Sequence, residues 1–435
     1  MKKDPPEHIT AGEEAELDIV GGGGRIAQLL NARTFTSLKN PAFRLYWGAL
    51  LCQMGSMNMQ MMARSLLIYR LTGSATILGV MSLFHAVPML LLSLFGGVLA
   101  DRLPKKNIML AGQAGSAVVS LAIALALAFG FLSADREGSW WILAVAALFQ
   151  GTIMGLMMPA RQSVLPEIVG GEQLLNAVSL TNVGTSGMRL LAPAATGFLI
   201  DAFDFEAVYF CMTGMYLVAV LFIMLLPLTS KTSLRGSGAL ADIKEGVRYV
   251  RHQTTILFIL GFTLVAVVLS MPYMLLMPIF TEDILKVGAS GMGVLMSVSG
   301  VGAIASSLIL ASLPNKKRGL LLLVSCVVMA VALVGFARST SWPLSLGLIV
   351  IVGMGQTGRM TLGNTLIQYY VDDEYRGRVM SIYMMEFGLT SFGTFAAGVM
   401  AENMGVQDVV GGFALALVVI SVLSLVFISR IRRLD

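Results

Sequence analysis

Charged residues are scarce in this chain, and their scarcity is the first constraint on its function. Asp, Glu, Lys and Arg make up 13% of the 435 residues, whereas soluble globular domains carry about 25%. Hydrophobic residues make up 56% of the chain, and its mean hydropathy is +0.80. These values exclude a water-soluble enzyme or binding domain and indicate a protein that is surrounded mainly by lipid.

Cysteine pairs and catalytic motifs are also lacking. Cys52, Cys211 and Cys326 lie in apolar runs without CxxC or CxxH spacing, so they support neither a disulfide framework nor a zinc site. The sequence contains no GxxxxGK[ST] phosphate loop, HExxH pair or nucleophile elbow, which argues against ATP hydrolysis and against an intramembrane enzyme. We therefore expect no cofactor.

The first 40 residues are polar and predict a disordered cytoplasmic tail. They contain an acidic cluster at 13–18 and four glycines at 21–24, and such a composition cannot bury a core. The segment also lacks the apolar stretch and the cleavage site of a secretory signal. Because no strand precedes the glycines and no lysine follows them, we interpret them as a linker.

Long apolar stretches fill the remainder of the chain and predict an all-α membrane protein with twelve transmembrane helices. A membrane-spanning helix needs about 20 apolar residues, and stretches of this length recur from Phe43 onward. They fall at 45–68, 75–99, 107–131, 140–160, 174–200, 206–228, 254–280, 289–312, 318–337, 342–367, 378–400 and 406–429. The predicted domains are the tail (1–40), a six-helix bundle (41–228), a cytoplasmic central loop (229–253) and a second six-helix bundle with a short basic tail (254–435).

The basic residues are distributed unevenly between the two sides of these helices. Of the 30 Lys and Arg residues, 23 lie on the side of the termini, four lie on the other side, and three lie within predicted helices. The positive-inside rule places both termini in the cytoplasm and the protein in the inner (plasma) membrane. The net charge of +5 and the pI near 9.1 therefore reflect topology, and nucleic acid is not an expected partner.

The two halves of the chain repeat each other weakly. QSVLPEIV at 162–169 and NTLIQYYV at 364–371 each end a predicted helix and precede a short acidic link. RLPKK at 102–106 has a degenerate counterpart in SLPNKKR at 312–318. Repeats of six helices are a transporter architecture in which the substrate site lies near the membrane midplane, between the repeats.

The loop after the second predicted helix carries the clearest motif. It reads GVLADRLPKK at 97–106 and resembles the signature loop of the major facilitator superfamily, in which a glycine and an aspartate precede an arginine and a basic pair. Pro104 stands where that family usually has glycine. The resemblance implies two pseudo-symmetric six-helix bundles that rock around a central cavity.

Other stretches are similar to one branch of that superfamily, which contains enterobactin-type siderophore exporters and macrolide-efflux-like proteins. They are YRLTGSATILG at 69–79, Pro-Glu at 166–167 and NAVSL at 176–180. The glycines and the proline of the fifth predicted helix loosely resemble an exporter pattern of the superfamily. The resemblance covers about residues 43–430. Many of its proton-driven drug exporters carry an arginine where this chain has Ala147, so coupling cannot be assigned through that position.

Ionisable residues inside predicted spans are candidate functional residues, because a charge in hydrocarbon costs several kcal/mol unless it is paired or faces water. The clearest are Arg64, His85, Arg189, Arg359 and Glu386. The resemblance places helices 1, 4, 7 and 10 around the cavity and helices 2, 5, 8 and 11 at the interface between the bundles. All five candidates lie on these helices.

Glu386 is the only acid deep in a predicted span. It and Arg359 lie at similar depths, roughly 10 Å from the helix ends nearest the termini. We predict that the two pair and that Glu386, or alternatively His85, responds to protons; a purely structural ion pair is the alternative. Arg64 lies near the outer end of its helix and could instead extend to the interface, whereas Arg189 lies nearer the middle of the membrane. An excess of arginine favours anionic substrates.

A second group of candidates lies at the ends of the predicted helices nearest the termini. The resemblance implies that Asp101 and Arg102 form a cytoplasmic gate between the bundles, and Arg161 is a candidate partner for Asp101 or Glu167. The basic residues of this loop can also anchor anionic lipid headgroups.

These observations together predict a secondary active transporter that exports an amphipathic small molecule, siderophore-like or drug-like, in exchange for protons. Membrane lipid, the substrate and the proton are the expected partners, and we expect a monomer. Uptake by symport, and a lipid flippase or scaffold, remain as alternatives.

Overall fold

The computed structural model describes residues 36–227, 239–314, 316–428, 432 and 434, and every regular element within them is helical. The elements are η1 (Thr36–Lys39), α2 (Pro41–Thr72), α3 (Ala75–Arg102), α4 (Lys105–Ala128), α5 (Trp141–Leu225), α6 (Ala239–His252), α7 (Thr254–Ser270), α8 (Pro272–Leu275), α9 (Met277–Ile279), η2 (Phe280–Ile284), α10 (Gly288–Ser312), α11 (Arg318–Arg338), α12 (Trp342–Tyr370), α13 (Arg376–Met404) and α14 (Val406–Phe427).

Most helix boundaries agree with the predicted spans to within a few residues, but the fourth span, predicted to end at residue 160, continues as helix to the bend at Gly170. The element α5 is continuous and contains the fourth, fifth and sixth spans. The chain bends between these spans at Gly170 and Asp204, which adopt positive φ values of 68° and 65°. Within the described residues, eight helical stretches are long and apolar enough to cross a membrane, and the longest, of 53 residues, contains two of the predicted spans. The predicted all-α fold with twelve long helical segments is thus confirmed.

The seventh span is broken where the sequence places its prolines. α7 ends before Pro272, and a second break precedes Pro278, so the segment continues as the short elements α8, α9 and η2. Each proline lacks a backbone donor and clashes with the preceding helical turn. The two prolines thus turn the end of this span into a bent segment that approaches the end of α2.

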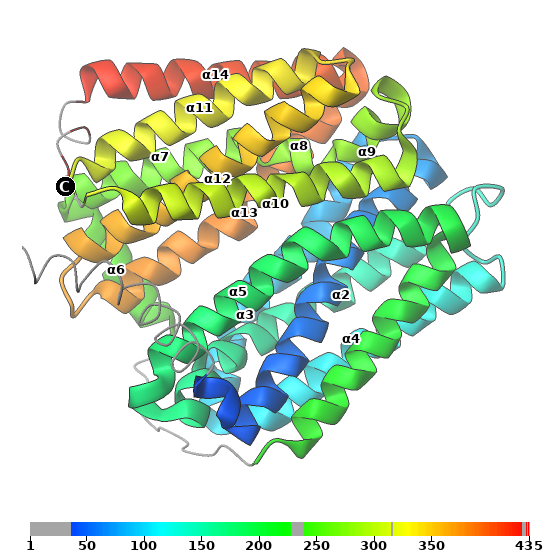
Figure 1. Cartoon of the computed structure of the whole chain (residues 1–435), viewed down its shortest axis with the longest axis horizontal. Helices are drawn as coiled ribbons and strands as arrows, with labels where there is room; N and C mark the ends of the chain where they lie inside the picture. The colour runs from blue at the N-terminus through cyan, green and yellow to red at the C-terminus, as the bar shows by residue number, and fades with distance from the viewer. Residues whose placement is uncertain (1–35, 228–238, 315, 429–431, 433, 435) are drawn as a thin grey trace, which may run out of the picture.

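The helices form two groups (Figure 1). The N-terminal group comprises α2 to α5, and the C-terminal group comprises α7 to α14; α5 packs on α10, and α3 packs on α13, to join them. We call the side where α2 begins and α14 ends the terminal face, and the other side the opposite face. The two groups diverge toward the terminal face, where α6 and the C-terminus lie (Figure 1).

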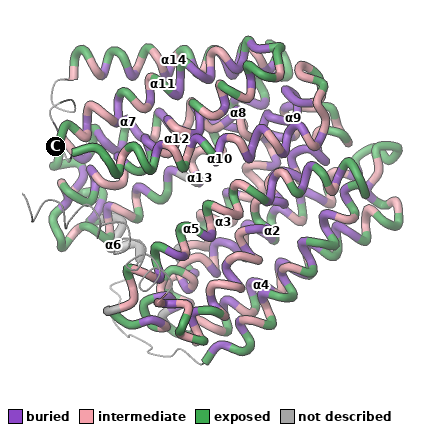
Figure 2. The backbone as a smooth tube through the Cα atoms, in the orientation of Figure 1, coloured by how far each residue is buried: buried purple, intermediate pink, exposed green. Residues whose placement is uncertain are grey.

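Buried residues lie inside each group, and exposed residues cover the outside (Figure 2). The outer surface carries many large apolar side chains, such as Phe198, Leu221 and Phe427. A soluble protein rarely exposes large contiguous apolar patches. This surface is instead what lipid-facing helices require.

Close helix packing inside the C-terminal group depends on two glycines. A Cβ atom built on Gly353 of α12 would lie 2.0 Å from the carbonyl oxygen of Ser299, and one built on Gly302 of α10 would lie 2.0 Å from that of Val350. Small residues allow such backbone approach between membrane helices. The replacement Gly353→Ala is therefore expected to destabilise the protein by about 1–3 kcal/mol, because the backbones must move apart.

The matched control for this prediction is Gly347→Ala on the same helix, because a Cβ atom there would meet nothing within 4 Å. Thermal unfolding of the purified protein in detergent measures both variants. The Tm should fall for Gly353→Ala and stay level or rise for Gly347→Ala, since alanine favours helix over glycine. Equal Tm values for the two variants would contradict the packing argument.

Two segments that were predicted to be irregular, the end of the tail (1–40) and part of the central loop (229–253), contain helical structure. The predicted tail lies outside the described residues up to residue 35, but Thr36–Lys39 form a short 3-10 helix in which the Ser37 amide donates to Asn176 Oδ1 at 3.0 Å. The packed chain thus begins slightly earlier than predicted. Within the predicted central loop, residues 239–252 form α6.

The helix α6 is docked on the C-terminal group through Tyr249. Its ring stacks on that of Tyr375, with centroids 4.3 Å apart, and its hydroxyl donates to Asp372 Oδ2 at 2.9 Å. Burial raises the pKa of Tyr249 above its usual value, so the hydroxyl keeps its proton at neutral pH. The Arg378 guanidinium also pairs with Glu245 of α6 at 3.1 Å.

Candidate functional site

Three long helices, α2, α12 and α13, are not among the stretches apolar enough to be identified as spans by composition alone. These helices carry Arg64, Arg359 and Glu386, respectively. The structure nevertheless places them in the two groups, packed against their neighbours. The long helices that are less apolar than the others are therefore those that hold most of the predicted ionisable residues.

Glu386 is held by a threonine of a neighbouring helix. Its side chain is 5% exposed, and Thr263 Oγ1 of α7 donates to Glu386 Oε1 at 2.6 Å. The same hydroxyl oxygen lies 2.9 Å from the Ile259 carbonyl oxygen, one turn back along α7. A threonine hydroxyl has one hydrogen and can also accept. It can therefore donate to an ionised Glu386, or accept from a protonated Glu386 while it donates to Ile259.

Arg359 lies near Glu386 but does not form the predicted ion pair with it. Arg359 is 2% exposed, and its charge is within electrostatic range of Glu386 and of Tyr383. Among the described residues, no ion pair within 4 Å involves Arg359, and its Nε atom is buried without a hydrogen-bond partner. The carboxylate instead takes its hydrogen bond from Thr263, which sequence reasoning missed.

Arg64 lies within the N-terminal group. It is within electrostatic range of His85 on α3 and of Tyr209 and Tyr216 near the end of α5. Tyr209 is completely buried, and its hydroxyl has no hydrogen-bond partner in the structure. His85 Nδ1 is likewise buried and unpartnered. These surroundings favour an inward orientation of Arg64 over the alternative in which it extends to the membrane interface.

Arg189 stands apart from both sets. Its side chain is exposed, and the next residue, Leu190, packs against Gly300 of α10 in the C-terminal group. The charge of Arg189 is within electrostatic range of Tyr273 of α8. The five predicted residues thus form two sets, Arg64 with His85 and Arg359 with Glu386, and Arg189 lies where the groups meet.

The predicted gate residues at the terminal face make no described contact between the two groups. Glu167 pairs with Lys105, inside the N-terminal group, and not with the predicted Arg161. Arg161 lies beside Tyr46, and its Nη1 atom is buried without a partner. Arg102 is exposed, and the side chain of Asp101 lies outside the described part of the structure. The gate role of these four residues therefore remains a prediction.

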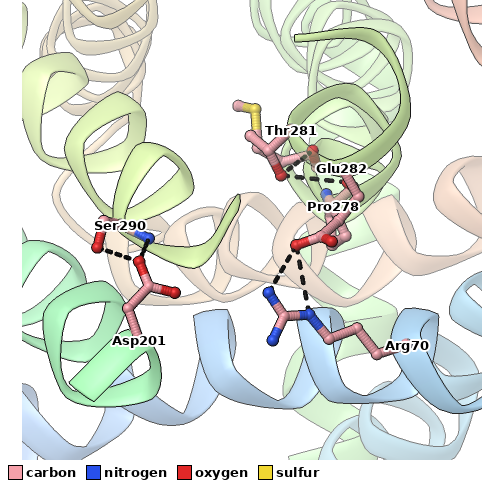
Figure 3. Close-up of polar contacts among 7 residues, drawn as sticks. Arg70, Asp201, Pro278, Thr281, Glu282 and Ser290 are labelled. Carbon is pink, nitrogen blue, oxygen red and sulfur yellow. Dashed lines mark hydrogen bonds and ion pairs between the residues drawn. The ribbon is translucent and has the colours of Figure 1, made fainter. Parts of the chain in front are cut away.

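Among the described residues, the charged side chains that bond from one group to the other lie instead at the opposite face, where the sequence analysis placed no site. Arg70 at the end of α2 pairs with Glu282 of η2, with Nη2 and Oε1 2.8 Å apart (Figure 3). Tyr69 donates a hydrogen bond to Asp283. Beside them, Asp201 of α5 accepts from the amide of Ser290 at 3.0 Å (Figure 3).

A further carboxylate makes the corresponding contact from the C-terminal group. Glu402 Oε2, near the end of α13, accepts from Ser74 Oγ and from the Thr76 amide, both at 3.0 Å. The only sequence signal for these residues is that each acid lies at the end of a predicted span. That signal does not identify a partner on a distant helix.

Comparison with known proteins places this arrangement in a family. A family model described as the Major Facilitator Superfamily matches residues 46–392. The staphyloferrin A transporter of Staphylococcus aureus is 23% identical over 77% of this chain and 83% of its own length. The multidrug efflux pump Tap of Mycolicibacterium fortuitum is 25% identical, over 85% of this chain and 91% of its own.

Solved structures agree on the fold. The nucleoside transporter NupG superimposes with a TM-score of 0.71 at 12% identity and covers 88% of this chain and 99% of its own. A bacterial homologue of the lysosomal transporter Spinster, solved in an inward-facing conformation, superimposes with a TM-score of 0.68 at 13% identity, over 90% of this chain and 98% of its own. The chain therefore belongs to the Major Facilitator Superfamily and is a membrane transporter rather than an enzyme.

Proposed function

We propose that this transporter exports an anionic amphipathic small molecule in exchange for protons, from a cytoplasm that contains both chain termini. The terminal face would then be the cytoplasmic face of the inner membrane. Export is supported by the similarity to efflux pumps such as Tap, and a siderophore-like substrate is supported by the similarity to the staphyloferrin A transporter.

Glu386 carries the coupling part of the proposal. A coupling carboxylate must be tolerated in both its protonated and its ionised form, because burying an unsatisfied polar group costs roughly 1–3 kcal/mol. The Thr263 hydroxyl can serve both forms, since it lies within hydrogen-bond distance of Glu386 and of the Ile259 carbonyl. Arg359, nearby but not in an ion pair, favours the ionised form without fixing it.

The excess of basic over acidic residues within the predicted spans carries the substrate part of the proposal. Arg64 and Arg359 lie inside the two groups and Arg189 lies between them, whereas Glu386 is the only buried acid among the described residues. A site lined by one sign of charge attracts ligands of the opposite sign. We therefore expect export of an anionic probe such as carboxyfluorescein and no export of the cation ethidium.

Inverted membrane vesicles test charge preference and direction together. Vesicles that contain the protein should accumulate the anionic probe when their interior is acidified, and an uncoupler should abolish the accumulation. Accumulation of ethidium alone would contradict the charge argument. Accumulation in intact cells but not in inverted vesicles would indicate uptake by symport, and movement of lipid headgroups without a response to the pH gradient would indicate a flippase.

A further inference from the structure

The contacts between the two groups follow the symmetry of the six-helix repeat. Asp201 ends the fifth span and contacts the start of α10, the eighth span. Glu402 ends the eleventh span and contacts the start of α3, the second span. Replacing each span of the first contact by its counterpart in the other repeat, span 5 by span 11 and span 8 by span 2, gives the spans of the second contact. The two carboxylates are thus equivalent residues of the two repeats.

Both carboxylates accept hydrogen bonds from the N-terminal end of a helix in the other group. The first amides of a helix have no partner within the helix, and the helix dipole places partial positive charge at this end, where a carboxylate is stabilising. Asp201 accepts from the Ser290 amide and from its hydroxyl, and Glu402 accepts from the Thr76 amide and from the Ser74 hydroxyl.

The helix packing around each carboxylate is also close. Next to Asp201, a Cβ atom on Gly197 would lie 2.5 Å from the Ala289 carbonyl oxygen. Next to Glu402, one on Gly398 would lie 2.5 Å from the Ala75 carbonyl oxygen. Such caps can form only while the two groups touch at the opposite face. A cap within one group would survive any rigid movement of the groups, whereas these two must break when that face opens.

We propose that Asp201 and Glu402 are a symmetric pair of latches that hold the opposite face closed and thereby set the balance between the two states of the transport cycle. The inference rests on the alternating-access part of the proposed function, but it does not depend on the substrate or on proton coupling. The Arg70–Glu282 pair adds a third contact, between the first and seventh spans.

The two latches are expected to differ in strength. α3 has a cap of its own, since Ser74 Oγ accepts from the Ile77 amide at 3.3 Å. α10 begins at Gly288, and the side chain of its N-cap residue, Val287, provides no cap, so Asp201 provides the capping side chain. Removing a capping side chain changes an equilibrium by about fivefold. The replacement Asp201→Ala is therefore expected to raise the population open at the opposite face about fivefold, and Glu402→Ala less.

Electron spin resonance distances in lipid nanodiscs test this on the full chain, without substrate or gradient. One spin label replaces Ala134 and the other Thr340, both exposed in loops of the opposite face, after Cys52, Cys211 and Cys326 are replaced by serine. The long-distance population should increase in Asp201→Ala, and further in the double variant with Glu402→Ala. Asp201→Asn, which keeps the shape of the side chain, should shift it less.

Asp408→Ala is the matched control. Asp408 pairs with Arg338 at 2.9 Å, also at the opposite face but within the C-terminal group, so its loss should leave the distances as in the wild type.

A second variant, Ser290→Asp, places a carboxylate against Asp201 and should open this face more than Asp201→Ala does. The proposal is overturned if the Asp201 and Glu402 variants, folded by gel filtration, show the same distances as Asp408→Ala. Failure of export with intact latch effects would instead refute only the proposed function.

Discussion

Replacing Glu386 with glutamine is expected to abolish gradient-driven transport while leaving the amount of folded protein unchanged. Glutamine has nearly the shape of glutamic acid and can still accept a hydrogen bond from Thr263, which lies 2.6 Å from Glu386, but it cannot carry a proton. If Glu386 is the coupling residue, the substrate can then exchange across the membrane only down its own gradient. The measurement is uptake of carboxyfluorescein into inverted vesicles with and without a pH gradient.

The control for this prediction is Glu374→Gln, because Glu374 is exposed in the link before α13. It removes the same charge from the same part of the chain and should leave transport intact. The replacement Thr263→Ser should retain coupling, since it keeps the hydroxyl, whereas Thr263→Val should weaken it. Gradient-driven uptake by Glu386→Gln at the wild-type rate would refute the coupling role of this residue.

The positions of the helices could be predicted from the sequence because each span needs a long run of apolar residues, and that signal is local. The breaks at Pro272 and Pro278 have an equally local cause, because a proline acts on the helical turn in which it lies. It missed α6, because the segment is polar on average and its docking depends on Tyr249 contacting Tyr375, more than a hundred residues away.

The candidate site was predictable only as a set of residue types at a certain depth. Depth along a helix follows from the rise per residue, and it placed Glu386 and Arg359 at similar levels. The rotation of each helix and its neighbours are set by packing between distant segments. The pattern of charges therefore suggested an ion pair, whereas the structure pairs Glu386 with Thr263 of α7. Asp201 and Glu402 were missed for the same reason.

Replacing Arg64 with glutamine is expected to weaken transport of the anionic probe by roughly 10- to 100-fold, which corresponds to the loss of one hydrogen-bonded charge, about 1.5–3 kcal/mol. Arg64 lies among His85, Tyr209 and Tyr216, and none of these carries a negative charge at neutral pH. Among the described residues, no carboxylate lies within electrostatic range of its guanidinium, so its positive charge is not neutralised. An anionic group of the substrate would supply the missing negative charge.

The concentration dependence of carboxyfluorescein uptake separates this role from a structural one. Arg64→Gln should raise the KM, and Arg64→Lys should give an intermediate value, because lysine keeps the charge but loses the planar fork of hydrogen-bond donors. Arg136→Gln, in an exposed loop of the opposite face, is the control and should keep the wild-type KM. Proton coupling in Arg64→Gln should survive at saturating probe, since Glu386 lies in the other group. A fall in the maximal rate at unchanged KM would assign Arg64 to folding or to movement of the groups, and the anion would then have to bind at Arg189 or Arg359.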